Sequence, residues 1–246
     1  MRCVTATAAS PQSPFNETDQ RWEPGAPLPS AWTLAGDDLL RSLSATDATL
    51  DAALIELVRP PDRLASLARE LTLGHSPEPV HIPIEVPEVG GQRYEVELLA
   101  LDASPPNTET TTVNPGTGLL HGIHLDNWDT LPIATRLQRS RRRLAINLGP
   151  GRRYLIFMVP DVLHISDQLQ PGDQQHIPRT PDVREYARRH PETVTLHRLL
   201  LEPGDAYVGP TDLVAHDGST EGIDQPSEIA FYLGRWPRGY YSSLLG

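Results

Sequence analysis

Chain-breaking residues constrain the fold of this chain more than any other feature. The 246 residues include 25 prolines and 18 glycines, which divide the sequence into short segments and leave little room for long helices. From about residue 78 onward, apolar residues recur with a period of two, as in Val80, Ile82 and Ile84. The pattern therefore predicts many short strands, and a hydrophobic content of 38% is enough for one compact domain.

Turn signals separate the predicted strands. Gly90 and Gly91 predict a hairpin turn, and Gly149-Pro150-Gly151 predicts a second hairpin between two apolar runs. The predicted strands cover residues 79–86, 93–101, 110–113, 119–125, 144–148, 154–159, 194–201, 205–208, 212–216 and 228–235.

Helical patterns precede these strands. Apolar residues from Leu50 to Leu57 fall on one helical face, and Pro60 ends that helix. Asp62 begins a second helix of the same kind, which Gly74 stops. Two further short helices are predicted within the strand-rich part, at residues 161–169 and 181–190.

Together these elements predict a mainly β fold with added helices. Residues 1–35 are predicted to be irregular, and residues 36–246 to form a single domain. Within it, residues 36–75 form an N-terminal helical layer and residues 76–246 a jelly-roll core. Residues 160–192 are predicted to be a helical insertion in this core.

Charge and composition exclude several classes of function. The net charge of −11 disfavours binding to nucleic acid or to an anionic membrane surface. All 21 basic residues are arginines, so any fixed cation in a binding site must be Arg or a metal. Cys3 is the single cysteine, which excludes a disulfide framework. With no transmembrane or signal pattern, we expect a cytoplasmic protein.

One short segment carries the pattern typical of a metal site. His124 and Asp126 are two residues apart on a predicted strand, so their side chains point to the same face. An imidazole and a carboxylate placed side by side are suitable metal ligands. His121 lies three residues before His124 and is interpreted as a neighbour of the site or as a structural residue.

A third ligand is expected from a distant strand. His216 ends the apolar run Leu213–Ala215, after turns at Pro203-Gly204 and Gly209-Pro210. A polar imidazole at the end of a buried strand needs a partner, and a metal is one. Two histidines and one carboxylate are the ligand set of non-haem Fe(II) oxygenases.

This arrangement resembles the 2-oxoglutarate/Fe(II)-dependent oxygenase superfamily over roughly residues 118–236. The resemblance implies a double-stranded β-helix (jelly roll) core and an enzyme that uses Fe(II), 2-oxoglutarate and O₂. It also implies an Arg on the last core strand that pairs with 2-oxoglutarate, here Arg235, and a hydroxyl or amide group such as Tyr154 or Asn147 that supports it. Arg238 and Arg153 are alternatives for the basic residue.

The resemblance further implies the type of reaction. Members of the family that halogenate lack the metal-binding carboxylate, so Asp126 implies hydroxylation or a related C–H oxidation with release of succinate and CO₂. A small molecule such as an amino acid or a specialised metabolite is the expected substrate. Residues 1–35 and 160–192 are the expected substrate lids, and their candidate polar groups are His164, Asp167, His176 and Arg179.

Two other classes of protein remain open at this stage. The segment from Pro203 to His216 resembles the second motif of metal-dependent cupin dioxygenases and isomerases, but the first cupin motif requires His-x-His and a following Glu that are absent here. A non-catalytic jelly-roll binding module is the other alternative. The run Arg139–Arg143 is predicted to be a solvated group of charges at the start of a strand.

Overall fold

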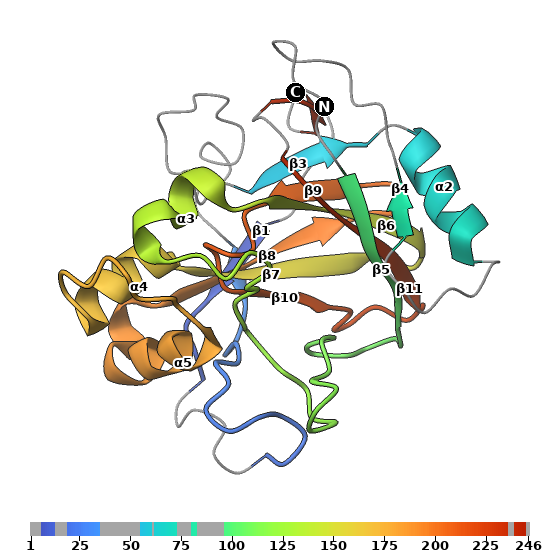
Figure 1. The fold of residues 1–246 in the computed structure, drawn as a ribbon. Helices are drawn as coiled ribbons and strands as arrows, with labels where there is room; N and C mark the ends of the chain where they lie inside the picture. Colours follow the sequence, from blue (N-terminus) through green and yellow to red (C-terminus); the bar gives the residue numbers. More distant parts are fainter. Residues whose placement is uncertain are drawn as a thin grey trace.

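The computed structural model describes residues 6–12, 19–34, 55–60, 62–72, 80–82, 96–235 and 239–244. Over these residues the protein is mainly β, with two antiparallel sheets and a few helices (Figure 1). Helices α3, α4 and α5 lie at one end of the sheets, whereas α2 lies at the other (Figure 1). Within the described part of the chain, no helix is long and apolar enough to cross a membrane.

The larger sheet has the strand order β12-β3-β9-β6-β11-β5-β4. β6 lies at its centre and is buried along almost its whole length, since a central strand has neighbours on both edges as well as on both faces. The strands of this sheet are β3 (Glu56–Arg59), β4 (Val80–Ile82), β5 (Val96–Ser104), β6 (Arg142–Pro150), β9 (Ala206–Gly209), β11 (Ser227–Gly234) and β12 (Ser242–Ser243).

The smaller sheet has the strand order β10-β7-β8-β1-β2. In β7 and β10, His216 lies opposite Phe157 and Gly218 lies opposite Leu155. Because alternate residues of a strand share a face, Arg153 at the start of β7 points to the same side of the sheet as His216. The strands are β1 (Ala6–Ala9), β2 (Thr33–Leu34), β7 (Arg153–Val159), β8 (Thr195–Leu201) and β10 (His216–Ser219).

Apolar side chains of both sheets form the main core. Leu155 and Leu199 of the smaller sheet belong to the same buried cluster as Tyr207 and Ile229 of the larger sheet. The outer face of the larger sheet is covered by α2, whose Leu64 and neighbouring apolar residues are buried in a second cluster. Burial of these faces is the main force that holds the layers together.

Three helices and one 3-10 turn cover the end of the sheets. Asp161 begins α4 by accepting a hydrogen bond from the backbone N–H of His164 at 3.0 Å. Val183 and Tyr186 of α5 are buried in the main core, so both predicted helices of the strand-rich part are confirmed. These elements are α3 (Ile133–Arg139), α4 (Val162–Leu169), α5 (Thr180–Arg189) and η1 (Pro191–Thr193), whereas α2 at the other end spans Asp62–Thr72. The sequence analysis did not predict α3.

The predicted hairpin at Gly149-Pro150-Gly151 is wrong, because β6 and β7 belong to different sheets. The backbone N–H of Gly151 bonds to the carbonyl of Pro226 at 2.8 Å, and a side chain at Gly151 would overlap the carbonyl groups of Gln225 and Pro226. The glycine therefore lets the chain pass close to a neighbouring loop and cross from one sheet to the other.

Other sequence predictions need correction at particular residues. Leu57, predicted to be helical, lies in β3, where pairing with β9 buries its side chain. Residue 55 of that predicted helix is also not helical, and residues 50–54 lie outside the described residues. Residues 110–113, 119–125 and 212–215 make only isolated bridges or turns. The predicted irregular segment 1–35 contains β1, which pairs with β8.

Candidate metal centre

His124 and His216 are held side by side by their own backbones. The N–H of His124 donates to the carbonyl of His216 at 3.1 Å, and the N–H of His216 donates back to the carbonyl of His124 at 2.8 Å. The N–H of Asp126 in turn donates to the carbonyl of Thr211 at 3.1 Å. The three predicted ligands, which come from two distant segments, are thereby brought together without a continuous strand.

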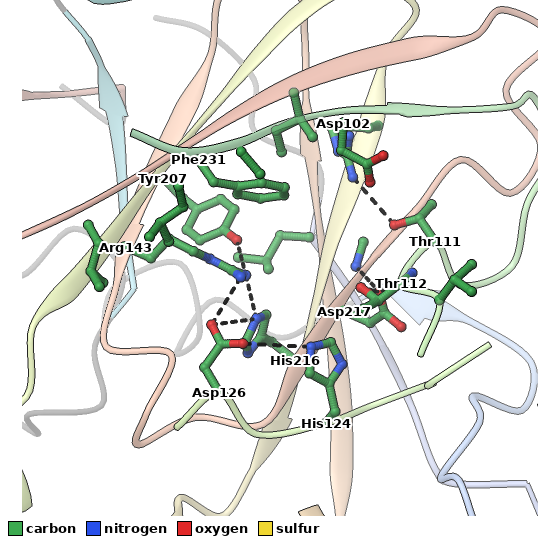
Figure 2. A pocket seen from close by; sticks show the side chains of 18 of the residues that line it. Asp102, Thr111, Thr112, His124, Asp126, Arg143, Tyr207, His216, Asp217 and Phe231 are labelled. Carbon is green, nitrogen blue, oxygen red and sulfur yellow. Dashed lines mark hydrogen bonds and ion pairs between the residues drawn. The ribbon is translucent and has the colours of Figure 1, made fainter. Parts of the chain in front are cut away.

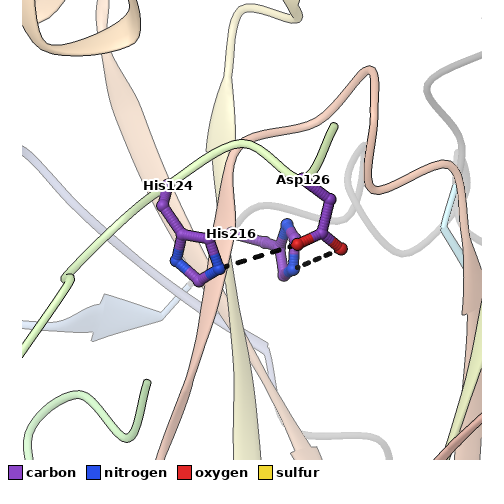
Figure 3. Close-up of side chains that lie close together, drawn as sticks. All are labelled: His124, Asp126 and His216. Carbon is purple, nitrogen blue, oxygen red and sulfur yellow. Dashed lines mark ion pairs between the residues drawn. The ribbon is translucent and has the colours of Figure 1, made fainter. Parts of the chain in front are cut away.

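The ligand atoms of this triad converge on one point (Figure 3). His124 Nε2 lies 3.8 Å from Asp126 Oδ1, and His216 Nε2 lies 3.6 Å from Asp126 Oδ2. All three ligand atoms lie within 4.8 Å of one another. Both histidines are buried, at 6% and 2% exposure, so they could hold a single metal ion away from bulk solvent.

The hydrogen bonds of the two histidines fix their tautomers. Nδ1 of His124 lies 2.8 Å from the carbonyl oxygen of Gly122, and Nδ1 of His216 lies 3.0 Å from that of Val214. A carbonyl oxygen can only accept, so each Nδ1 carries the hydrogen and each Nε2 has its lone pair directed into the site. Backbone or carboxylate acceptors play this role for histidines that bind metals.

The charge states of the triad also suit a cation. Burial lowers the pKa of His124 to about 4, and burial together with Arg143 lowers the pKa of His216. Burial opposes ionisation of Asp126, but Arg143 and the two imidazoles hold the pKa of this carboxyl well below its usual range. At neutral pH the site therefore has two neutral imidazoles and one carboxylate, the states in which these groups bind metals. We conclude that the residues fit a divalent metal ion.

A buried arginine adjoins the triad (Figure 2). Arg143 is 8% exposed; its Nη1 lies 3.0 Å from Asp126 Oδ2, and its Nη2 contacts both His216 Nε2 and the hydroxyl of Tyr207. The indole N–H of Trp128 also donates to Asp126 Oδ2, at 2.9 Å. The prediction that the run Arg139–Arg143 is solvated is therefore wrong for Arg143, which lies on the inner face of β6.

The triad lies in a cavity of about 710 Å³ between the sheets, a volume typical of small-molecule sites. Its walls include the apolar side chains of Leu155, Phe231 and Leu233. Two exposed hydrophobic residues, Val113 and Trp128, also line it. The cavity thus combines a polar interior with apolar walls.

A second buried cation lines the cavity beyond His216. Arg153 is 2% exposed, and among the described residues its Nη1 has no hydrogen-bond partner. Its Nη2 reaches Thr111 Oγ1 only at 3.5 Å. Burial lowers the pKa of Arg153 to about 10. Burying a guanidinium with an unsatisfied N–H group costs free energy, which an anion or another hydrogen-bond acceptor would offset.

Gly218 makes room for this guanidinium. A Cβ atom at Gly218 would overlap Nη2 of Arg153 and Oγ1 of Thr111, so glycine is required for their close approach. Asp217, the preceding residue, is also buried, and burial raises the pKa of its carboxyl to about 7. Its Oδ1 accepts from Thr112, whereas its Oδ2 has no partner within the described part of the chain.

Two of the three residues predicted to hold 2-oxoglutarate do not line the cavity. Arg235 is exposed, donates to the carbonyl of Arg139 at 2.9 Å, and does not line the cavity. Asn147 is buried, and its side-chain amide donates to the carbonyls of Gly151 and Leu201, so it fastens the crossing between the sheets. The structure thus separates both residues from the triad.

Tyr154 and His121 have different surroundings. Tyr154 is at the cavity wall, but its ring contacts Arg198, whose guanidinium carbon lies 4.5 Å from the ring centroid. His121 lies 4.7 Å from His124, ring to ring, and its Nδ1 is 2.7 Å from Glu23 Oε2. His121 therefore adjoins the site without facing it. Arg238 lies outside the described residues.

Comparisons with known proteins add little to this geometry. No family model and no curated protein matches the sequence. Two structures of YcfD from Escherichia coli, one described as a ribosomal oxygenase, match with 15% and 14% identity and TM-scores of 0.24 and 0.26. These matches cover 97% and 98% of this chain but only 42% and 44% of the YcfD chains. Likeness at this level is too weak to assign a fold or an activity, so we base the assignment on the site itself.

Proposed function

We propose that this protein is an Fe(II)- and 2-oxoglutarate-dependent oxygenase that hydroxylates a small molecule. The observation that carries the proposal is the buried triad of His124, Asp126 and His216, with ligand atoms within 4.8 Å and both imidazole tautomers already fixed. Two histidines and one carboxylate leave coordination positions of an iron ion open for 2-oxoglutarate and O₂. A cytoplasmic location stays a prediction.

The order of the strands supports a double-stranded β-helix core. From β6 onward, β6, β9 and β11 lie in the larger sheet, and β7, β8 and β10 lie in the smaller one. The chain therefore winds repeatedly between two facing sheets, as a jelly roll requires. His124 is joined to the edge of β10 by its bridge to His216, so the metal ligands lie in the cavity between the two sheets.

Arg153 is our candidate for the residue that binds the distal carboxylate of 2-oxoglutarate. It replaces Arg235 in this role because it is buried, lines the cavity and has an unpartnered Nη1 among the described residues. Its guanidinium adjoins Gly218, which is two residues, or about 7 Å, along β10 from His216. That separation is comparable to the length of a five-carbon dicarboxylate. The planar guanidinium can bind a carboxylate through two parallel hydrogen bonds.

The remaining chemistry is divided between the metal and the cavity walls. When bound, iron would activate O₂ at the expense of the oxidative decarboxylation of 2-oxoglutarate to succinate and CO₂. His124, Asp126 and His216 would hold the ion, and Trp128 orients Asp126 by donating to its Oδ2. The apolar walls exclude water from the reacting groups.

The type of reaction and the class of substrate are part of the proposal. A carboxylate at position 126 leaves no vacancy for a halide in the ligand set, which favours hydroxylation. The cavity of about 710 Å³ has room for 2-oxoglutarate together with a small substrate.

A matched pair of arginine variants tests the cosubstrate site. We expect Arg153→Met to raise the Kd for 2-oxoglutarate at least about 30-fold, since loss of a buried charge partner costs about 2 kcal/mol or more. Isothermal titration of the Mn²⁺-loaded protein measures this Kd. Arg235→Met is the control and should bind as the wild type does. Unchanged binding in Arg153→Met, or equal losses in both variants, would contradict the assignment.

A further inference from the structure

Arg143 occupies part of the space that a metal would share with the triad. Its guanidinium lies 3.0 Å from Asp126 Oδ2 and contacts His216 Nε2. It also packs over the ring of Phe231, with its guanidinium carbon 4.8 Å from the ring centroid (Figure 2). Two of the three candidate ligands therefore already bind a cation that belongs to the chain.

The contact with His216 cannot persist when a metal binds. Because Nδ1 of His216 donates its hydrogen to Val214, Nε2 has a single lone pair, which either accepts from Arg143 or binds the metal. A divalent ion beside a buried guanidinium also adds repulsion between like charges in a site with little water. Metal binding therefore requires Nη2 of Arg143 to leave His216.

The displaced guanidinium needs a new partner. Nε of Arg143 has no hydrogen-bond partner among the described residues, and Nη2 keeps only the hydroxyl of Tyr207, at 2.8 Å. A buried cation that has lost an acceptor and lies beside a divalent ion is costly unless an anion compensates for both. Arg143 lines the same cavity as the triad, so a carboxylate bound next to the metal can take that place.

We propose that Arg143 couples the two binding events: it competes with the divalent metal for His216 and Asp126, and a carboxylate ligand relieves this competition. This inference rests on the proposed function, in which the triad binds a metal and the cavity binds 2-oxoglutarate. The coupling is reciprocal, so the metal strengthens binding of the carboxylate by the same factor as the carboxylate strengthens binding of the metal. The protein alone therefore binds metal weakly, and metal and cosubstrate load together.

Titration of metal-free protein with Mn²⁺, with and without saturating 2-oxoglutarate, tests the coupling. The ratio of the two Kd values for Mn²⁺ measures it. We expect Arg143→Met to bind Mn²⁺ alone about tenfold more tightly than the wild type and to lower the ratio about tenfold, within the usual range for coupled sites. Direct chelation of the metal by 2-oxoglutarate also couples the two binding events. This part of the coupling persists in Arg143→Met, so the ratio of the two Kd values stays above one.

Two further variants keep the test decisive. Arg143→Gln removes the charge but can still donate to Asp126, and it should also lower the Kd for Mn²⁺. This variant serves as the test if Arg143→Met folds poorly. Arg152→Met is the control, since Arg152 is exposed and does not line the cavity. Weaker or unchanged Mn²⁺ binding in both Arg143 variants, with normal binding by the wild type, overturns the inference but leaves the proposed function intact. Absence of Mn²⁺ binding in every protein overturns both.

Discussion

The two ends of the cavity hold buried charges in opposite ways. At the triad end, Asp126 faces Arg143 at 3.0 Å and also accepts a hydrogen bond from Trp128. At the other end, Arg153 and Asp217 are equally buried, but Nη1 of the arginine and Oδ2 of the aspartate have no partners among the described residues. At the triad end a carboxylate pairs with the buried cation, whereas at the other end no carboxylate among the described residues is hydrogen-bonded to Arg153.

This difference indicates which end depends on a ligand for its stability. A buried pair costs several kcal/mol when one partner is removed, but an unpaired buried charge already carries that cost in the free protein. At the end with Arg153, which we call the open end, binding of an anionic ligand would offset this cost. The triad end is arranged to keep its geometry until a metal displaces Arg143.

The largest effect on stability is expected when one partner of the ion pair at the triad end is removed. Asp126→Ala leaves Arg143 buried without its carboxylate, and we expect the metal-free protein to lose about 3–5 kcal/mol of unfolding free energy. Urea denaturation monitored by circular dichroism measures this loss. Arg153→Met removes a cation whose Nη1 has no hydrogen-bond partner among the described residues, and it should be neutral or stabilising. Equal losses in the two variants would contradict the contrast between the ends.

The pH dependence of stability probes Asp217 at the open end. Burial raises the pKa of Asp217 from 3.8 to about 7, so between these pH values the folded protein binds a proton that the unfolded chain does not. The contribution of Asp217 to stability is therefore full below about pH 4 and is lost as the pH rises through about 7. Relative to Asp217→Asn, the metal-free wild type should lose about 4 kcal/mol between pH 4 and pH 8. A constant difference between the two proteins over this range would show that Asp217 titrates normally.

The smallest effect is expected from crowding Arg153 without removing it. Gly218→Ala places a methyl group where Nη2 of Arg153 lies, so the guanidinium must shift. We expect the Kd for 2-oxoglutarate to rise about tenfold, equivalent to about 1.4 kcal/mol, with little change in the Kd for Mn²⁺. Both constants can be obtained by isothermal titration. A loss confined to Mn²⁺ would instead place Gly218 with the triad end.

The triad end could be predicted from sequence because its information is local. The spacing of His124 and Asp126 fixes their common direction, and His216 ends an apolar run that follows a turn. The structure brings all three together, although residues 119–125 form only isolated bridges rather than the predicted strand. Two backbone hydrogen bonds between His124 and His216 hold the ligands together in place of the predicted strand.

At the other end, the sequence could name Arg153 only as an alternative to Arg235, because the choice depends on which strands are neighbours. Arg153 and Arg235 both adjoin apolar strands, and periodicity does not tell which sheet each strand joins or which face each arginine shares with His216. Arg143 was missed for a related reason, since a run of arginines resembles a solvated patch. One available signal was the alternation in β6, which places Arg143 and Asn147 on one face and Leu144 and Ile146 on the other.

The measurement that tests the central claim most directly is an anaerobic optical titration of the metal-free protein with Fe(II) and then 2-oxoglutarate. A chelated 2-oxoglutarate gives a weak visible metal-to-ligand charge-transfer band, and His216→Ala serves as the control. We predict that the wild type develops the band and that the variant does not. Iron binding without the band would contradict the role of 2-oxoglutarate and favour a metal-dependent cupin, and absence of iron binding by the wild type would show that His124, Asp126 and His216 are not a metal site.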